Sequence, residues 1–335
     1  MNKNIKVSIV VPTYNREEPL KSCINSLLIQ NYPKNNYEII IVDDASSDGT
    51  EKLVKDFIRK DKKIRYFKQN ENKGSYAARN IGIKNAKGEI IGFTDDDCIA
   101  DKNWIREAVE LFDKNKDISG IQGTTKPFQD VRTKYWFHKL DYIEVNKPSR
   151  QHPTCNMFYK RKIILNAGLF DERFRNGGDE ELAWRLKEKG YNIIFSNKGI
   201  VYHQVRKIAY MDFIFKKMKF HSIFKKPLSF YYYPLFYKKH PKLRKKFLFL
   251  NFINNNSIFY ISFLFPSLIS ILYGHMQFGS FFGMTSFILY LFYRRSVYWN
   301  GLIKVIVGFP VYIILDFISI IYAIIGSIKF KSFVI

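Results

Sequence analysis

Three consecutive aspartates, Asp95, Asp96 and Asp97, follow a short apolar stretch that runs from Glu89 to Thr94. That stretch predicts a buried β-strand, and successive side chains of a strand point to opposite faces. We therefore expect Asp95 and Asp97 to lie on one side and Asp96 on the other. Two carboxylates that face the same way repel each other unless a cation lies between them. Oxygen ligands suit a hard ion, Mg2+ or Mn2+, which completes its shell with water and substrate phosphate.

The alternative for an acidic run is a solvated loop. Two features of the chain weigh against it: the run ends a buried-looking strand, and the 335 residues carry 54 Lys or Arg but only 30 Asp or Glu. The length allows one good-sized core and a further region. Three scattered cysteines without metal-ligand spacing indicate a reducing compartment.

Strands and helices alternate through the first half of the sequence. Apolar runs predict four strands, at Val7–Val11, Glu38–Val42, Ile64–Phe67 and Glu89–Thr94. Helical spacing of apolar residues predicts a helix after each of the first three. This order is typical of an α/β fold with a parallel sheet, in which ligands bind beyond the carboxyl ends of the strands. Polar residues follow three of those ends, so we expect a nucleotide-type ligand there.

Three segments match a known family together: VSIVVPTYNR from Val7, EIIIVDDASSDGT from Glu38 and FTDDDC from Phe93. Over roughly residues 5–205 the chain resembles a family-2 glycosyltransferase with the Rossmann-like GT-A fold. The resemblance implies transfer of a sugar from a nucleotide donor, UDP by default, with inversion at the anomeric carbon. It also implies a set of binding residues: Pro12, Thr13 and Tyr14 along the nucleotide pocket, Asp44 on the base, Asp96 beside the nucleotide, and Asp95 and Asp97 holding the diphosphate through a metal.

A second acidic group, Asp179 and Glu180, follows a flexible Gly177-Gly178 pair and opens a predicted helix. Acids in the first turn of a helix are favoured by its dipole, so simple capping is one explanation. The glycine pair points instead to a close backbone approach to a ligand. By the resemblance, Asp179 is the general base that deprotonates the acceptor hydroxyl, with Glu180 as the alternative, and Gly178 stands where the family often has Glu.

Three further residues have weaker assignments. His203 ends a short predicted strand, and the resemblance places a metal- or diphosphate-contacting His there; a structural role is the alternative. Lys73 and Arg79 flank the helix before the Asp-x-Asp strand and are candidates for phosphate contacts. Solvated surface explains these two residues equally well.

The last third of the chain predicts membrane association. Residues 206–250 form a basic amphipathic linker, with thirteen Lys or Arg between residues 206 and 246. Apolar segments at 257–274, 278–293 and 305–328 predict two or three transmembrane helices within residues 251–335. Flanking Lys and Arg place the catalytic domain on the cytoplasmic side of a hairpin or multi-pass anchor in the cell membrane. Whether the third segment spans or re-enters stays open.

These features together predict a membrane-anchored, metal-dependent inverting glycosyltransferase that acts on a lipid-linked or cell-surface glycan. A processive polysaccharide synthase is the nearest alternative, although the Gln-x-x-Arg-Trp motif usual in such enzymes is absent from this sequence. A non-catalytic membrane scaffold of the same fold is a second alternative. We expect no nucleic-acid partner, because the basic region leads into apolar segments.

Overall fold

The computed structural model describes residues 5–128, 138–209, 229–243, 269, 272–273 and 321–332. The chain divides into two compact units, residues 1–213 and residues 214–335, and each is described by itself.

The first unit begins with the predicted alternation of strands and helices. Its first half contains, in order, β1 (Val7–Thr13), α1 (Glu17–Leu28), β2 (Tyr37–Asp43), α2 (Thr50–Lys60), β3 (Ile64–Lys68), α3 (Ser75–Asn85) and β4 (Ile90–Phe93). Its second half contains β5 (Cys98–Ala100), α4 (Trp104–Lys114), β6 (Ile118–Pro127), β7 (His138–Asp141), β8 (Met157–Lys160), α5 (Arg161–Ala167), α6 (Gly178–Glu188), β9 (Asn192–His203) and β10 (Arg206–Ala209). The α/β class and the four predicted strands are confirmed.

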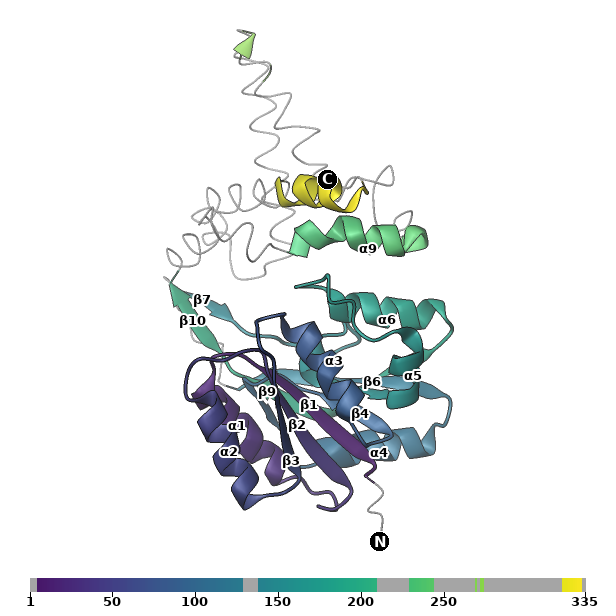
Figure 1. The fold of residues 1–335 in the computed structure, drawn as a ribbon. Helices are drawn as coiled ribbons and strands as arrows, with labels where there is room; N and C mark the ends of the chain where they lie inside the picture. The colour runs from purple at the N-terminus through teal and green to yellow at the C-terminus, as the bar shows by residue number, and fades with distance from the viewer. Residues whose placement is uncertain are drawn as a thin grey trace. The chain divides into compact units, whose positions relative to one another are not determined.

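One eight-stranded sheet forms the centre of this unit, in the order β3-β2-β1-β4-β8-β6-β9-β5 (Figure 1). The first four strands are parallel, as predicted. The next strand, β8, runs antiparallel to both of its neighbours, β4 and β6. Strands β6 and β9 are parallel to each other. The sheet is therefore mixed. Thr13 at the end of β1 lies opposite Asp43 at the end of β2, so the polar strand ends meet at one edge.

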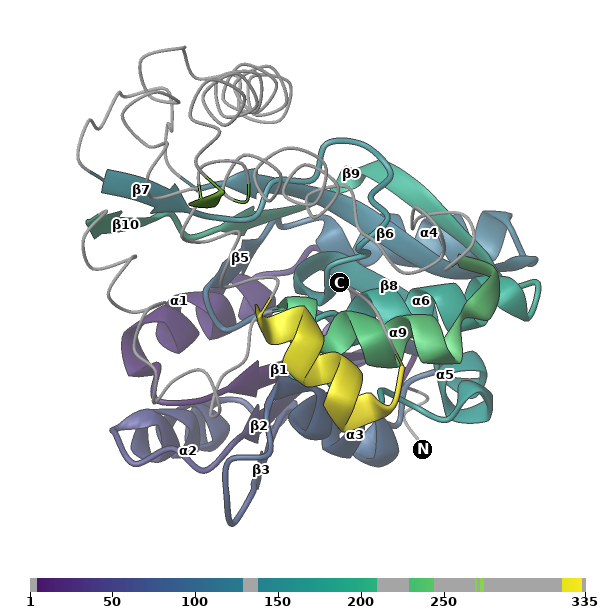
Figure 2. The same cartoon turned by 90° about the horizontal axis from the view of Figure 1, so that it is seen from above.

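Helices cover both faces of the sheet (Figures 1 and 2). On one face, Val7, Ile9 and Val11 of β1 belong to a buried cluster that includes side chains of α1, α2 and α4. On the other face α3 packs very closely, since a Cβ on Gly82 would lie 2.3 Å from Val10. This close approach brings the first turn of α3 to the edge where the strand ends meet.

The second unit is described over short stretches only. A 3-10 turn (Ser229–Tyr232) leads into α9 (Tyr233–Lys239), and residues 321–330 form another helix. The Tyr231 ring packs against Phe330 at 5.4 Å, and Lys238 donates a hydrogen bond to the Phe330 carbonyl at 3.0 Å. Within the described residues, no helix has the length and apolar character needed to cross a bilayer. The predicted span 278–293 lies outside those residues, and only 269, 272 and 273 of span 257–274 and 321–328 of span 305–328 are among them.

Candidate active site

The three aspartates lie in a turn, so the prediction from strand alternation was wrong. Strand β4 ends at Phe93, and the Cys98 N–H bonds to the Asp95 carbonyl at 3.1 Å, closing a turn over Asp95–Asp97. Because alternation applies only to extended backbone, it does not determine which aspartates share a side. Asp96 and Asp97 have a common cationic neighbour, and Asp95 has a different one.

Two arginines offset part of the charge of this acidic turn. Arg79 of α3 contacts Asp95 at 2.5 Å, and Arg16, just after β1, contacts Asp97 at 2.6 Å and Asp96 at 3.5 Å. The Thr13 hydroxyl donates to Asp96 at 2.9 Å. Burial raises the pKa of Asp96 to about 7, with Arg16 opposing the shift and Asp97 adding to it. The end of β1 thus brings Thr13 and Arg16 to the acidic turn, and helix α3 brings Arg79.

His203 and Asp97 have donor chemistry that fits a divalent cation. The His203 Nδ1–H donates to the Gln204 carbonyl at 2.8 Å, so in neutral imidazole Nε2 carries the lone pair. That nitrogen lies 3.6 Å from an Asp97 carboxylate oxygen. Within the described residues, the ligand atoms of Asp97, Cys98 and His203 lie within 4.8 Å of one another. Cys98 suits a hard ion poorly, since a hydrogen bond with Cys155 and burial raise the pKa of its thiol.

Asp44 organises the loop that follows β3. Its carboxylate accepts hydrogen bonds from Gln69 Nε2 at 2.6 Å and from the backbone N–H groups of Lys73 and Gly74 at 2.7 and 2.8 Å. The Lys73 side chain is exposed and pairs with Glu71 at 3.3 Å, so its backbone rather than its charge reaches the site. Of the predicted pocket residues on β1, Pro12 and Thr13 are buried, and Tyr14, which follows the strand, is 41% exposed.

Asp179 lies at the start of α6, as predicted, and neutral donors surround it. The Tyr76 hydroxyl donates to Asp179 Oδ1 at 3.1 Å, and the Glu180 N–H contacts the same oxygen at 3.1 Å. Among the described residues, Oδ2 has one longer contact, 3.4 Å from the Thr154 N–H. Burial raises the pKa of Asp179, while the charge of Arg79 and the Tyr76 hydrogen bond oppose the shift.

The two neighbouring glutamates have other partners. Arg150 donates to Glu180 at 2.6 Å. Glu181 is fully buried and forms a two-point ion pair with Arg185, at 3.0 and 2.8 Å, and Arg185 also donates to the carbonyls of Ala167 and Leu169. Glu181 therefore ties α6 to the end of α5 and has a structural role.

The Tyr76 ring leaves no space for a side chain at position 178. A Cβ at this position would lie 2.8 Å from the Tyr76 ring, and the Gly178 N–H donates to the Tyr76 hydroxyl at 3.0 Å. A larger residue, such as the Glu expected from the family pattern, would displace the ring. Gly178 therefore differs from the Glu of the family pattern because the Tyr76 ring on α3 fills the space that a side chain would need.

Helix α3 links the two acidic groups. Arg79 contacts Asp95 and lies over the Tyr76 ring, 5.6 Å from its centroid, while Tyr76 contacts Asp179. Sequence reasoning missed three residues of this site: Arg16, Gln69 and Tyr76. Arg16 closes the quoted motif and Gln69 follows a parallel strand, so both carried a signal; Tyr76 carried none, since its partner is 103 residues away.

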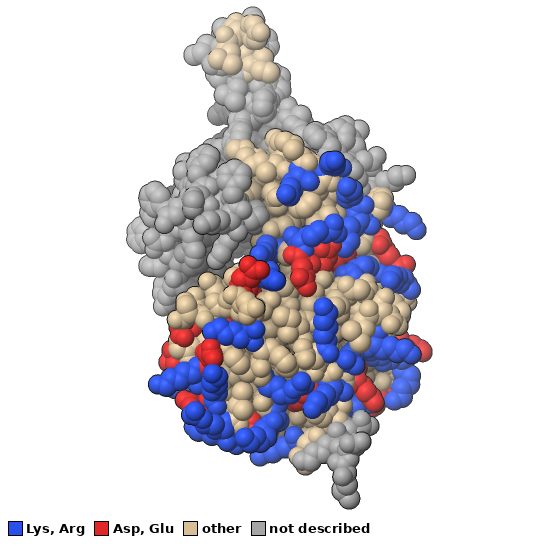
Figure 3. Space-filling model, in the orientation of Figure 1, with Lys and Arg blue, Asp and Glu red and all other residues tan. Residues whose placement is uncertain are grey.

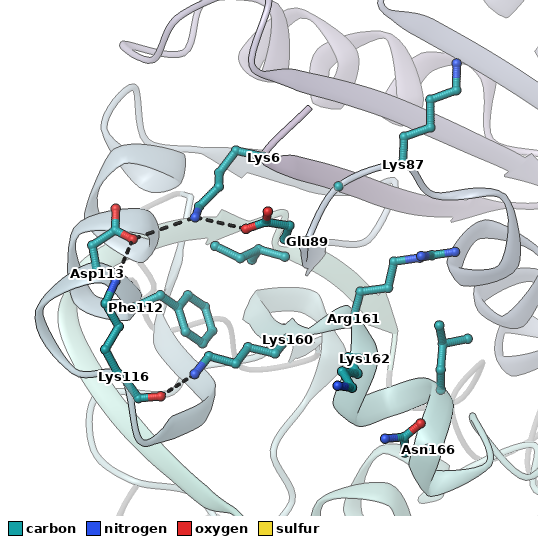
Figure 4. A pocket seen from close by; sticks show the side chains of 13 residues that line it. Lys6, Lys87, Glu89, Phe112, Asp113, Lys116, Lys160, Arg161, Lys162 and Asn166 are labelled. Atoms are coloured by element: carbon teal, nitrogen blue, oxygen red, sulfur yellow. Dashed lines mark hydrogen bonds and ion pairs between the residues drawn. The ribbon is translucent and has the colours of Figure 1, made fainter. Parts of the chain in front are cut away.

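A separate hollow of about 550 Å3 lies near the amino end of β4, lined by basic side chains (Figure 4). Lys6 contacts Glu89 at 3.0 Å and Asp113 at 3.7 Å, and Lys116 contacts Asp113 at 3.5 Å. These ion pairs offset part of the positive charge that lines the hollow. The predicted site residues do not line this hollow.

Comparison with known proteins identifies the family of the catalytic region. The family model "Glycosyl transferase family 2" matches residues 8–174. Glycosyltransferase AglE of Haloferax volcanii is 29% identical over 204 residues, covering 60% of this chain and 67% of that protein. The poly(ribitol-phosphate) beta-N-acetylglucosaminyltransferase TarS of Staphylococcus aureus is 34% identical over 130 residues, 37% of this chain and 22% of TarS. Residues 8–174 form a glycosyl transferase family 2 domain, and these relatives support glycosyltransferase activity for it.

Two solved structures show the same fold. TarS 1–349 in complex with UDP-GlcNAc has a TM-score of 0.51 at 24% identity, covering 62% of this chain and 60% of that one. The mannosyltransferase PcManGT of Pyrobaculum calidifontis, in complex with GDP-Man and Mn2+, has a TM-score of 0.54 at 16% identity, covering 97% and 87%. The GT-A-like α/β fold with a mixed sheet follows from this likeness. The chain matches only about a fifth of the whole TarS sequence.

Proposed function

We propose that the protein is a membrane-associated, metal-dependent, inverting glycosyltransferase that moves a sugar from a UDP-sugar to a lipid-linked or cell-surface glycan. The observation that carries this proposal is the link through α3. Arg79 contacts Asp95 at 2.5 Å, and three residues earlier Tyr76 contacts Asp179 at 3.1 Å. One face of α3 thus contacts both a leaving-group site and a proton acceptor, the two groups that a single displacement needs.

The proton acceptor in this proposal is Asp179. A hydroxyl must lose its proton as it attacks, and a carboxylate within hydrogen-bond reach can take it. Oδ1 is occupied by Tyr76 and the Glu180 N–H, which leaves Oδ2 for the acceptor. The acceptor oxygen bonds to the anomeric carbon, its proton moves to Oδ2, and the bond to the diphosphate breaks with its electron pair. One displacement inverts the anomeric carbon.

Asp95 and Asp97, with His203, would hold a divalent cation, Mg2+ or Mn2+. When bound, the ion offsets the charge that gathers on the leaving nucleoside diphosphate. Arg16 and Arg79 lie against the same carboxylates and are placed to meet phosphate oxygens. On the nucleotide side, Pro12, Thr13, Tyr14, Asp44 and Asp96 complete the proposed donor pocket, with Lys73 contributing through its backbone.

The choice of donor rests on the relatives. TarS is described as a poly(ribitol-phosphate) beta-N-acetylglucosaminyltransferase and was solved with UDP-GlcNAc, which makes UDP-N-acetylglucosamine the first donor to test. GDP-mannose is the second, because PcManGT was solved with it.

Membrane association is supported by the sequence after residue 205. Residues 257–274 and 278–293 carry no charge, and the thirteen Lys or Arg between residues 206 and 246 suit an anionic bilayer surface. On the described helix 321–330, Ile321, Ile324 and Ile328 are exposed on one face. On the surface drawn in Figure 3, Asp and Glu lie between the Lys and Arg of the first unit, unlike a continuous nucleic-acid footprint.

A donor panel tests the proposal. Detergent-solubilised protein receives UDP- and GDP-sugars, and nucleotide release is measured with and without EDTA. We expect release from one donor, its loss with EDTA, and its loss in Asp97→Asn. Release that persists in EDTA would overturn metal dependence, and no release from any donor, with an acceptor lipid extract supplied, would favour a non-catalytic scaffold. Long products from a single binding event would favour the processive synthase.

A further inference from the structure

Tyr76 connects α3 to the first turn of α6 through both sides of its hydroxyl. The oxygen accepts a hydrogen bond from the Gly178 N–H at 3.0 Å, and its proton is donated to Asp179 Oδ1 at 3.1 Å. Tyr76 is 6% exposed. A buried hydroxyl with both a donor and an acceptor in place has a fixed orientation, and so does the carboxylate that it contacts.

The ring of Tyr76 is held on its other sides. It stacks on Phe170 at 5.4 Å, with the ring planes 22° apart, and Arg79 lies over it. Asn80 of the same helix donates to the Phe170 carbonyl at 2.9 Å and accepts from the Phe170 N–H at 2.9 Å. Helix α3 thus fixes the segment leading to α6 as well as the base itself.

We propose that Tyr76 is the positioning residue of the general base: its hydroxyl holds Asp179 Oδ1 so that Oδ2 is the oxygen that takes the acceptor proton. This inference rests on the proposed function, since it assigns a role relative to Asp179. Gly178 is part of the device, because the absence of a Cβ lets the Tyr76 ring approach the backbone that donates to its hydroxyl.

The charged and titratable groups that face Asp179 come from three elements. Helix α3 supplies Arg79 and Tyr76, β8 supplies the buried Tyr159, and α6 itself supplies Glu180, whose charge is paired with Arg150. Removal of the Tyr76 hydroxyl takes away a hydrogen bond that favours the ionised carboxylate, so the pKa of Asp179 should rise further.

The test is Tyr76→Phe, which keeps the ring and removes the hydroxyl. Nucleotide release from UDP-N-acetylglucosamine, or the donor that the panel identifies, is followed across pH with water as acceptor. We expect kcat to fall roughly ten- to a hundredfold. The acidic limb of the kcat profile should move to higher pH. UDP affinity in the presence of Mn2+ should stay within about twofold of the native value.

Tyr66→Phe is the matched control. The Tyr66 hydroxyl donates to another carboxylate of the sheet edge, Asp43, at 2.6 Å, so the control removes a hydrogen bond of the same type away from Asp179. Its acidic limb should coincide with that of the native enzyme. An equal loss of rate at every pH in Tyr76→Phe, or no loss at all, would overturn the positioning role. Turnover that survives Asp179→Asn would instead overturn the proposed base, whatever Tyr76→Phe does.

Discussion

The acidic turn and the first turn of α6 hold their carboxylates by different chemistry. At the turn, Asp95 and Asp97 contact guanidinium groups at 2.5 and 2.6 Å. At α6, Asp179 contacts a hydroxyl and backbone N–H groups, with Arg79 acting on it only through its charge. A direct cationic partner lowers the proton affinity of a carboxylate, and neutral donors do so less. The difference separates a site for binding charge from a site for accepting a proton.

The largest expected effect tests the proton-accepting side. Asp179→Asn removes the proposed base and should lower turnover about 10^2- to 10^4-fold. Glu180→Gln should have a far smaller effect, because Glu180 is paired with Arg150 at 2.6 Å. The measurement is sugar transfer at saturating donor. If Glu180→Gln proves the more damaging change, Glu180 is the base.

Glu181 separates structure from chemistry within the same turn. Glu181→Gln leaves the half-buried Arg185 without its charged partner and should lower the free energy of unfolding by roughly 3–5 kcal/mol. Denaturant unfolding measures this loss, and kcat per folded molecule should be retained. Asp179→Asn is the converse control, with near-native stability and little turnover. A large kcat loss in Glu181→Gln at a temperature where it is folded would contradict a purely structural role.

His152, which packs beside α6, shows how burial lowers the pKa of a side chain there. It is 4% exposed, and Lys187 of α6 lies 2.7 Å from its Nε2. Burial first and the Lys187 charge second lower the pKa of His152 to about 4. The unfolded chain then binds more protons between about pH 4 and 6.5, so stability should fall as pH falls through that window, by at most about 3 kcal/mol.

His152→Asn checks this expectation. The residue has a φ of +45°, which Asn tolerates better than most residues. Thermal unfolding at pH 7 and at pH 4.5 should show a smaller difference in the variant than in the native protein. An unchanged difference would assign the acid sensitivity to other groups.

The smallest expected effect concerns the contact that joins the two regions. Gly178→Ala places a methyl group 2.8 Å from the Tyr76 ring and should cost roughly 1–3 kcal/mol of stability. It should also reduce turnover, since the ring carries the hydroxyl that holds Asp179. Gly199→Ala is the control, because the nearest atom to its Cβ would be 3.8 Å away. Equal effects of the two substitutions would mean that the Tyr76–Gly178 contact is not critical.

The sequence predicted much of this fold because its signals are local. Four apolar runs became β1 to β4, and the helix that opens with Asp179 became α6. The antiparallel entry of β8 could not be predicted, since it depends on which edge the chain returns to. The geometry of Asp95–Asp97 was predicted wrongly because the strand ends at Phe93, two residues before Asp95, and alternation does not extend into the turn.

The candidate site shows the same division. Asp44, Asp95, Asp97 and Asp179 were chosen as candidates because their residue types and the order of their motifs along the chain resemble the family. Their partners were harder, because a hydrogen bond between Tyr76 and Asp179 depends on how α3 packs against the sheet. Gly178 illustrates the point: by sequence it is a departure from a pattern, and in the structure it accommodates an aromatic ring.

The most direct test of separate charge-binding and proton-accepting sites is calorimetry of UDP binding in the presence and absence of Mn2+. It compares the native protein with Asp97→Asn and Asp179→Asn. We predict that Asp97→Asn weakens Mn2+-dependent UDP binding by at least about tenfold. Asp179→Asn should stay within about twofold of the native affinity. Equal weakening by the two substitutions would contradict separate charge-binding and proton-accepting sites.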